Sequence, residues 1–178
     1  MPIRPARTFR DVDKVPYTRK SKSNMSKNYV KTEPHQHLHQ FQTGVKQNYE
    51  VLIELVAEQT YYHRDNALEA SRQTVVRQLE KGASGKYFFR VRPYPHHIIR
   101  ENRMVAGAGA DRISKGMRRA FGKPTHKAAL IRQGQPVFSV YTYKQFIPVV
   151  QEAYRKASKK LSGTWKILIK DKDIGFAS

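Results

Sequence analysis

The stretch of this sequence with the clearest capacity to bind phosphate is the glycine- and cation-rich segment 104–124, MVAGAGADRISKGMRRAFGKP. A nucleotide-binding P-loop needs a glycine five positions before its Gly-Lys pair and a hydroxyl residue after it, because backbone N–H groups wrap the phosphates and the hydroxyl binds magnesium. Met117 and Pro124 occupy those two positions here. The dinucleotide-binding fingerprint fails as well, since Arg112 stands where its third glycine is required. We therefore expect no nucleotide site in this segment.

The same segment suits contact with a longer phosphate chain. Four glycines between residues 100 and 123 allow the backbone to approach phosphates closely. Seven cations accompany them, against two carboxylates: Arg100, Arg103, Arg112, Lys115, Arg118, Arg119 and Lys123. These features predict a flexible cationic loop over 101–124 whose affinity for nucleic acid falls steeply with salt. The alternative is a mobile loop whose charges only keep the chain in solution.

Histidines form a second group with chemical potential. In the motif HQHLH, His35, His37 and His39 would share one face of an extended segment and could bind zinc. The chain has no cysteine and few carboxylates near this motif, so we expect no metal site beyond adventitious binding, and no cofactor. His96 and His97 are expected to face RNA or solvent, because no serine and carboxylate arrangement indicates that they act as catalysts.

Carboxylates give little support to an enzyme. Asp65 and Glu69 are spaced as an acid–base pair on one helix face would be, but helix capping and interaction with the helix dipole explain both. The sequence therefore predicts that the chain is not an enzyme. A small basic enzyme acting on RNA is the remaining alternative of this kind, and loss of turnover on substitution of a carboxylate such as Asp111 would reveal it.

The N-terminal stretch is basic and has little apolar periodicity. Residues 1–31 contain nine cations, two carboxylates and three prolines. The cations are Arg4, Arg7, Arg10, Lys14, Arg19, Lys20, Lys22, Lys27 and Lys31. Phe9, Tyr17 and Tyr29 stand singly among them, which favours a segment that orders on RNA by stacking and phosphate contact. We expect residues 1–40 to form an RNA-binding arm; the alternative is a disordered, solvated tail.

The rest of the chain alternates between strand and helix periodicities. Period-two alternation predicts a strand within 49–61. A helical period over 64–82 predicts a helix that Asp65 or Asn66 caps and Gly82 ends. A strand then follows at 86–92, with its two arginines, Arg90 and Arg92, on one face.

Three further elements complete the prediction. They are two strands joined by a hairpin or sharp reversal at Gln133–Gly134, a helix that starts near Pro148, and a strand at 164–170. This order predicts a single α+β domain over 41–178, built as a two-layer sandwich of two helices on one mixed sheet.

Composition narrows the class of partner. The chain has 178 residues and a formal net charge of +20, and such a surplus disfavours a compact state unless a polyanion neutralises it. Nucleic acid and an anionic membrane are the two common polyanions. No stretch approaches 18 consecutive apolar residues, which favours nucleic acid. The absence of cysteine excludes disulfides and fits a reducing compartment.

Five stretches of the chain carry a family resemblance: RPARTFR and YTRK near the N-terminus, RDNALEASRQTVVRQLEK, YFFRVRPYPHHIIRENRM and GADRISKGMRRAFGKP. On these the chain resembles the large-subunit ribosomal proteins called ten-e in archaea and eukaryotes and sixteen in bacteria, and is most similar to the archaeal form. The resemblance implies a hammerhead-type α+β fold and a cytoplasmic position on large rRNA near 5S rRNA. Members help to shape the aminoacyl-tRNA site and complete subunit assembly late.

The resemblance also implies roles for particular residues. The arm cations from Arg4 to Lys27, together with Arg90, Arg92 and Arg100, are expected to bind rRNA. A second set is expected to lie in the loop at the tRNA site: Arg103, Arg112, Lys115, Arg118, Arg119 and Lys123. Neighbouring ribosomal proteins are expected partners; a membrane and a small-molecule substrate are not. The alternative function is an extraribosomal RNA-binding or ribosome-assembly factor.

Overall fold

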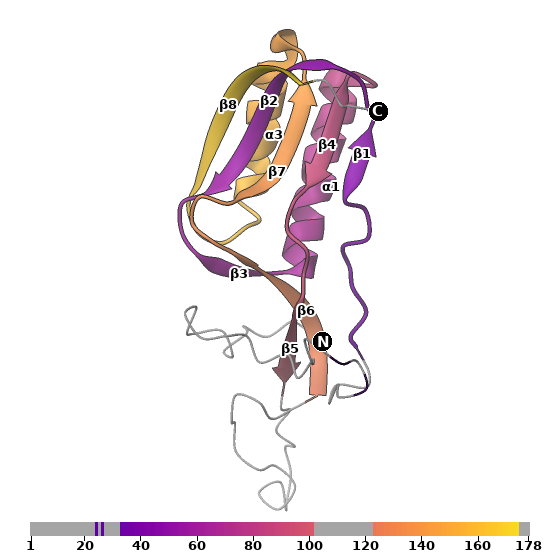
Figure 1. Ribbon diagram of the computed structural model, residues 1–178, viewed down its shortest axis with the longest axis vertical. Coiled ribbons are helices and arrows are strands. Elements are labelled where there is room, and N and C mark those ends of the chain that lie inside the picture. Colours follow the sequence, from indigo (N-terminus) through magenta and orange to yellow (C-terminus); the bar gives the residue numbers. More distant parts are fainter. Residues whose placement is uncertain (1–23, 25, 27–32, 102–122, 175–178) are drawn as a thin grey trace, which may run out of the picture.

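The computed structural model describes residues 24, 26, 33–101 and 123–174 (Figure 1). The elements of these residues are β1 (Gln42–Gly44), β2 (Tyr49–Ala57), β3 (Tyr61–Arg64), α1 (Asp65–Ala83), β4 (Tyr87–Val91), β5 (His97–Glu101), β6 (Lys123–Ile131), β7 (Pro136–Thr142), α3 (Ile147–Ser158) and β8 (Trp165–Ile174). A 3₁₀ turn, Lys144–Phe146, leads into α3. Two helices with strands before, between and after them confirm the α+β class.

The strands of the described residues form two sheets. One has five strands in the order β1-β4-β7-β2-β8, the other has three in the order β3-β6-β5, and every neighbouring pair is antiparallel. The expectation of one mixed sheet is therefore wrong. The strands β7 and β8, which α3 connects, do run in the same direction. They are never neighbours, since β2 lies between them and runs the opposite way.

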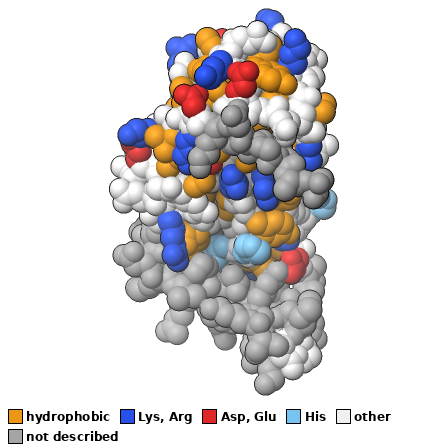
Figure 2. All heavy atoms as spheres, turned by 45° about the horizontal axis from the view of Figure 1, so that its top comes forward, with side chains coloured by type: hydrophobic (Ala, Val, Ile, Leu, Met, Phe, Trp, Pro, Cys, Tyr) orange, Lys and Arg blue, Asp and Glu red, His pale blue; other side chains and the backbone are white. Residues whose placement is uncertain are grey.

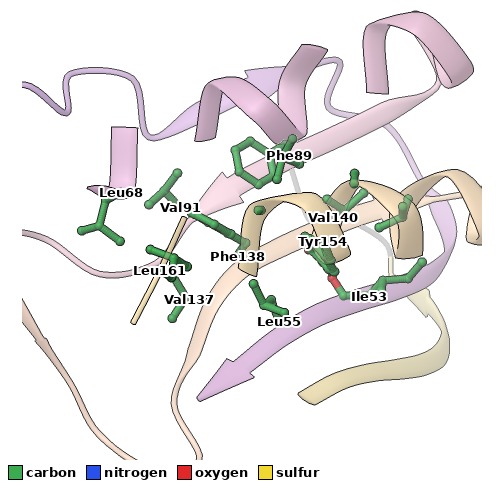
Figure 3. Close-up of a cluster of buried hydrophobic side chains, with 14 of the residues drawn as sticks. Ile53, Leu55, Leu68, Phe89, Val91, Val137, Phe138, Val140, Tyr154 and Leu161 are labelled. Atoms are coloured by element: carbon green, nitrogen blue, oxygen red, sulfur yellow. Dashed lines mark hydrogen bonds between the residues drawn. The ribbon is translucent and has the colours of Figure 1, made fainter. Parts of the chain in front are cut away.

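Both helices cover the same face of the five-stranded sheet, as Figure 1 shows. The inner face of the sheet carries alternate residues of β2, β4 and β7, and these pack with buried residues of α1 and α3 into one core (Figure 3). Phe89 and Phe138 meet with ring centroids 5.4 Å apart. The buried Tyr154 hydroxyl donates a hydrogen bond of 2.9 Å to the Ile53 carbonyl, so α3 is fixed to β2 by a polar contact inside an apolar layer.

Two expectations about α1 are wrong. Its N-cap is Arg64, and neither Asp65 nor Asn66 caps it with a side chain, because Asp65 already lies in the first helical turn. Gly82 does not end the helix, which continues to Ala83. A Cβ at Gly82 would lie 2.6 Å from Val149 Cγ1, so the glycine serves the close approach of α1 to α3.

The reversal at Gln133–Gly134 is confirmed, but the hairpin is wrong. Gly134 has φ +78° and Gln135 N–H donates to the Arg132 carbonyl at 3.1 Å, which makes a turn. The two flanking strands nevertheless belong to different sheets. The turn is held at the end of β2, where Gly134 N–H donates to the Ala57 carbonyl at 2.8 Å. The chain therefore passes from one sheet to the other at this point.

Residues 33–41, which we call the strap, run from beside β6 to β1 in extended form (Figure 1). Leu38 is fully buried in the main core. Glu33 forms an ion pair with Lys127 of β6 at 2.9 Å, and the Phe41 carbonyl accepts a hydrogen bond of 2.8 Å from Val91 N–H. The strap is thus anchored at both of its ends and at its centre.

Candidate nucleic-acid interface

The outer face of the five-stranded sheet, away from the helices, carries both arginines expected in β4 and directly after it. Arg90 is exposed and lies opposite Ser139 in the register of β4 and β7. Arg92 Nε donates to the same serine hydroxyl at 2.9 Å, which confirms that the two arginines share this face. Among the residues that the structure describes, Arg90 has no ion-pair partner, so its guanidinium is available to an external anion.

Glu54 organises the charges at the centre of this face. The carboxylate is only 5% exposed, and its two oxygens lie 3.6 Å from an Arg92 nitrogen and 2.7 Å from Lys170 Nζ. The negative charge of Glu54 therefore neutralises only one of the two positive charges. Arg92 also uses part of its hydrogen-bonding capacity within the sheet. The group leaves a net charge of +1 that is held in place by hydrogen bonds.

Aromatic residues in and beside the five-stranded sheet divide into buried and accessible ones. Tyr49, Phe88 and Tyr141 are almost fully buried in a small cluster and are not available to stack on a base. Tyr94 is 46% exposed and its ring is stacked on Phe41, with centroids 5.4 Å apart. Base stacking on such a ring is a common means of holding RNA. The sequence interpretation missed Tyr94, although its position between two prolines was a usable signal.

The three-stranded sheet carries the ends of the predicted cationic loop. Arg100 lies in β5 and is partly buried, whereas Lys123, at the start of β6, is exposed. Glu101 and Lys123 are direct partners in the antiparallel register. The described chain therefore stops at Glu101 and resumes at Lys123 on two neighbouring strands. The other loop cations, and all the arm cations from Arg4 to Lys31, lie outside the described residues.

Charged side chains on the described surface are dispersed. Figure 2 shows Lys and Arg side chains over several elements, with fewer acidic ones between them. Arg90 and Arg92 lie on one face of the five-stranded sheet, whereas Arg100 and Lys123 lie in the three-stranded sheet, where the register places them opposite Pro124 and Glu101. Such a distribution suits contact with an extended phosphate surface.

The expectation for His97 is wrong. Its neighbour His96 is exposed as expected, but His97 is 7% exposed, because it lies within β5 and packs with its ring centroid 5.2 Å from Tyr62. Burial lowers the pKa of His97 to about 4. The buried His63 of β3 behaves in the same way, with a pKa of about 4 for the same reason. Both histidines are therefore neutral in the folded protein at neutral pH.

These two histidines predict a loss of stability in acid. Between the ordinary pKa of 6.5 and the folded-state value of about 4, the unfolded chain binds protons that the folded chain does not. The free energy of unfolding should thus decrease as the pH is lowered through this window, by up to about 1.4 kcal/mol per pH unit for each histidine. Urea unfolding measured across the window should show a shallower slope for His97→Gln. The matched variant His96→Gln should keep the wild-type slope, and equal slopes in the two variants would contradict the assignment.

Asp65 and Glu69 form no acid–base pair. Asp65 is fully buried in the first turn of α1, where its charge is favourable to the helix dipole as expected. Arg72 donates two hydrogen bonds to Glu69, of 2.8 and 2.7 Å, and these hold the pKa of this carboxyl below its usual value. His35, His37 and His39 are exposed along the strap. The geometry thus provides anion-binding groups and no catalytic constellation among the described residues.

The fold and surface define a class: a small basic α+β protein with an open sheet face and a cationic segment carried by two strands, features that favour nucleic-acid binding. Neither helix in the described part of the chain is long and apolar enough to cross a membrane.

Comparison with known proteins gives the family. The family described as ribosomal protein L16p/L10e matches residues 12–168. Large ribosomal subunit protein uL16 of Pyrobaculum islandicum is 38% identical, over 98% of this chain and 96% of its own length. The uL16 proteins of Haloarcula marismortui and Archaeoglobus fulgidus are 38% and 37% identical, each over 95% of this chain and 95% and 94% of their own lengths. The chain belongs to the L16p/L10e family of ribosomal proteins.

This family membership confirms the resemblance to archaeal large-subunit proteins. A ribosomal protein of this family is a structural constituent of the large subunit and not an enzyme.

Proposed function

We propose that this chain, in the cytoplasmic ribosome, binds large-subunit rRNA near 5S rRNA, and that segment 101–124 helps to shape the aminoacyl-tRNA site. The arm of residues 1–40 and the outer face of the five-stranded sheet supply the rRNA contacts. Recognition is mainly of RNA shape and phosphate positions, because the groups available are cations and not base-specific pairs. The chain joins the subunit late and contacts neighbouring ribosomal proteins.

The observation that carries this proposal is the pairing of Glu101 with Lys123. Two neighbouring strands hold both ends of a segment that contains five cations and four glycines. Strand pairing of this kind fixes where the segment starts. The glycines in its sequence allow the backbone to approach a phosphate chain closely. This arrangement is suited to reach an RNA surface beyond the one that the domain covers.

Copy number distinguishes the proposal from an assembly factor. Large subunits washed in moderate salt should retain one copy of the chain each, as quantitative mass spectrometry can measure. A factor that leaves the particle would be present on immature subunits and depleted from mature ones, which would contradict a structural role.

Substitution of Arg90 tests whether the outer face of the five-stranded sheet binds rRNA. Because its guanidinium is exposed and unpaired by described carboxylates, Arg90→Ala should remove one phosphate contact. The slope of log affinity for large-subunit rRNA against log salt should fall by about one. Lys159→Ala removes an equal charge at the end of α3, in the helical layer, and should leave the slope unchanged. Filter binding across a salt series measures both, and identical slopes would contradict a specific role of this face.

A further inference from the structure

Three separate parts of the chain meet at the N-terminal end of α1. His37 comes from the strap, Asp65 from the first turn of α1 and His126 from β6. Each offers one ligand atom, and these atoms all lie within 4.8 Å of one another. Few carboxylates lie near the HQHLH motif in the sequence, and the fold brings Asp65 to His37 from 28 residues away.

The Asp65 carboxylate is held in a fixed orientation. It is fully buried, and its oxygens accept hydrogen bonds from His37 N–H at 2.9 Å and Asn66 N–H at 3.0 Å. His37 Nδ1 lies 2.9 Å from the same Oδ2 atom that accepts the His37 backbone bond. Backbone donors of this kind orient a ligating carboxylate from outside the first coordination shell. The carboxylate cannot turn away without losing both bonds.

His126 contributes an imidazole that lacks a partner at one nitrogen. Its Nδ1 atom is buried and makes no hydrogen bond with the described residues. Its ring centroid lies 6.2 Å from that of His37. A metal binds the neutral imidazole of histidine through a nitrogen lone pair, and a buried nitrogen without a hydrogen bond among the described residues is able to offer one. A buried, unpaired nitrogen beside a buried carboxylate calls for an additional partner.

We propose that His37, Asp65 and His126 bind one Zn²⁺ ion, each through a single atom, with water in the fourth position. Two imidazoles and one carboxylate suit zinc, whereas magnesium and calcium prefer oxygen ligands. Bonds of about 2.0–2.1 Å to tetrahedral zinc place the ligand atoms about 3.3 Å apart, so His37 and Asp65 need to separate only slightly. The metal takes the position of the hydrogen between His37 Nδ1 and Asp65, and the neutral imidazole that binds it carries its one N–H on Nε2, so that the Nδ1 lone pair faces the metal.

The position of the site suggests what the metal does. The strap is already tied to the domain by Leu38 in the core and by the Glu33–Lys127 ion pair. Zinc between His37, α1 and β6 would add a link at the point where three elements meet. Because residues 1–31 precede the strap, the metal would fix the chain just after this basic stretch.

His35 and His39 provide matched controls on the same segment. Both are exposed, their rings lie 5.2 Å apart, and among the described residues neither belongs to the group of possible ligands formed by His37, Asp65 and His126. Adventitious zinc binding by the HQHLH motif would depend on these two residues as much as on His37. The proposed site depends on Asp65 and His126 and on neither control residue.

Titration of the full chain with Zn²⁺, in competition with a chromophoric chelator, tests the site. Wild type, His35→Ala and His39→Ala should bind one Zn²⁺ per chain with equal affinity. His126→Ala and the isosteric Asp65→Asn should bind at least about 100-fold more weakly, since each loses a ligand outright. Undiminished affinity in His126→Ala and Asp65→Asn, or an equal loss in the two control variants, would overturn the proposal.

X-ray absorption of the zinc-loaded wild-type chain tests the same site without a variant that must fold. The expected spectrum shows four nitrogen or oxygen ligands, two of them imidazoles. A six-coordinate spectrum, or one with a single imidazole or with three, would overturn the proposal.

Discussion

Large subunits that carry a chain without residues 1–31 are expected to lose the protein at salt concentrations that the full-length chain withstands. The deleted stretch has nine cations and two carboxylates, a net charge of +7. A protein that makes six to ten phosphate contacts loses about 10³–10⁵ in affinity between about 50 and 200 mM salt, and removal of most such contacts lowers affinity throughout this range. Retention after graded salt washes, measured by immunoblot, gives the result.

The truncation leaves the domain intact, because the strap and its buried Leu38 are kept. Two full-length variants distinguish the contribution of positive charge from that of aromatic stacking. Replacing the nine cations by Gln should reproduce the loss, whereas replacing Phe9, Tyr17 and Tyr29 by Leu should weaken attachment less and leave its salt dependence steep. Normal retention of the truncated chain in salt-washed subunits would show that the arm does not bind rRNA.

Replacing Arg118 and Arg119 by alanine should leave the copy number of the chain in large subunits unchanged and still impair function. In the proposed arrangement these residues contact RNA at the aminoacyl-tRNA site and do not hold the domain to rRNA. Loss of two charge-assisted contacts, each contributing about 1.5–3 kcal/mol, should slow tRNA accommodation or late maturation by at least tenfold. Stopped-flow measurement of aminoacyl-tRNA accommodation on purified ribosomes, together with sucrose-gradient profiles, checks this.

The matched control keeps the charges: Arg118→Lys with Arg119→Lys should retain most of the activity if phosphate charge is what matters. Wild-type accommodation and maturation in the double alanine variant would refute the role of the loop. A drop in copy number would assign these arginines to attachment instead.

Hydrophobic periodicity in the sequence was enough to predict the helices and strands whose structure depends mainly on their own residues. The strand β2, the helix α1 and the strand β8 appear where periodicity placed them, and Pro148 lies in the first turn of α3 as expected. The sheet order was not predictable in this way. The antiparallel insertion of β2 between β7 and β8 depends on contacts across about a hundred residues of chain, and no local signal encodes it.

The same limit applies to the surface. Arg90 and Arg92 were placed on one face because period-two alternation requires it. Their different roles were not predictable, since Glu54, which binds Arg92, comes from another strand and also binds Lys170, 116 residues further along the chain. His97 was misjudged because the sequence does not distinguish it from the exposed His96, while the fold places it in a strand against Tyr62.

Protein–RNA cross-linking on intact large subunits, mapped residue by residue, tests the central claim most directly. The proposed function predicts cross-links from residues 1–31 and from the outer sheet face around Arg90 to large-subunit rRNA. It also predicts cross-links from 102–122 to aminoacyl-tRNA. Cross-links confined to the helical layer of α1 and α3, with none from the arm or from segment 102–122, would contradict it.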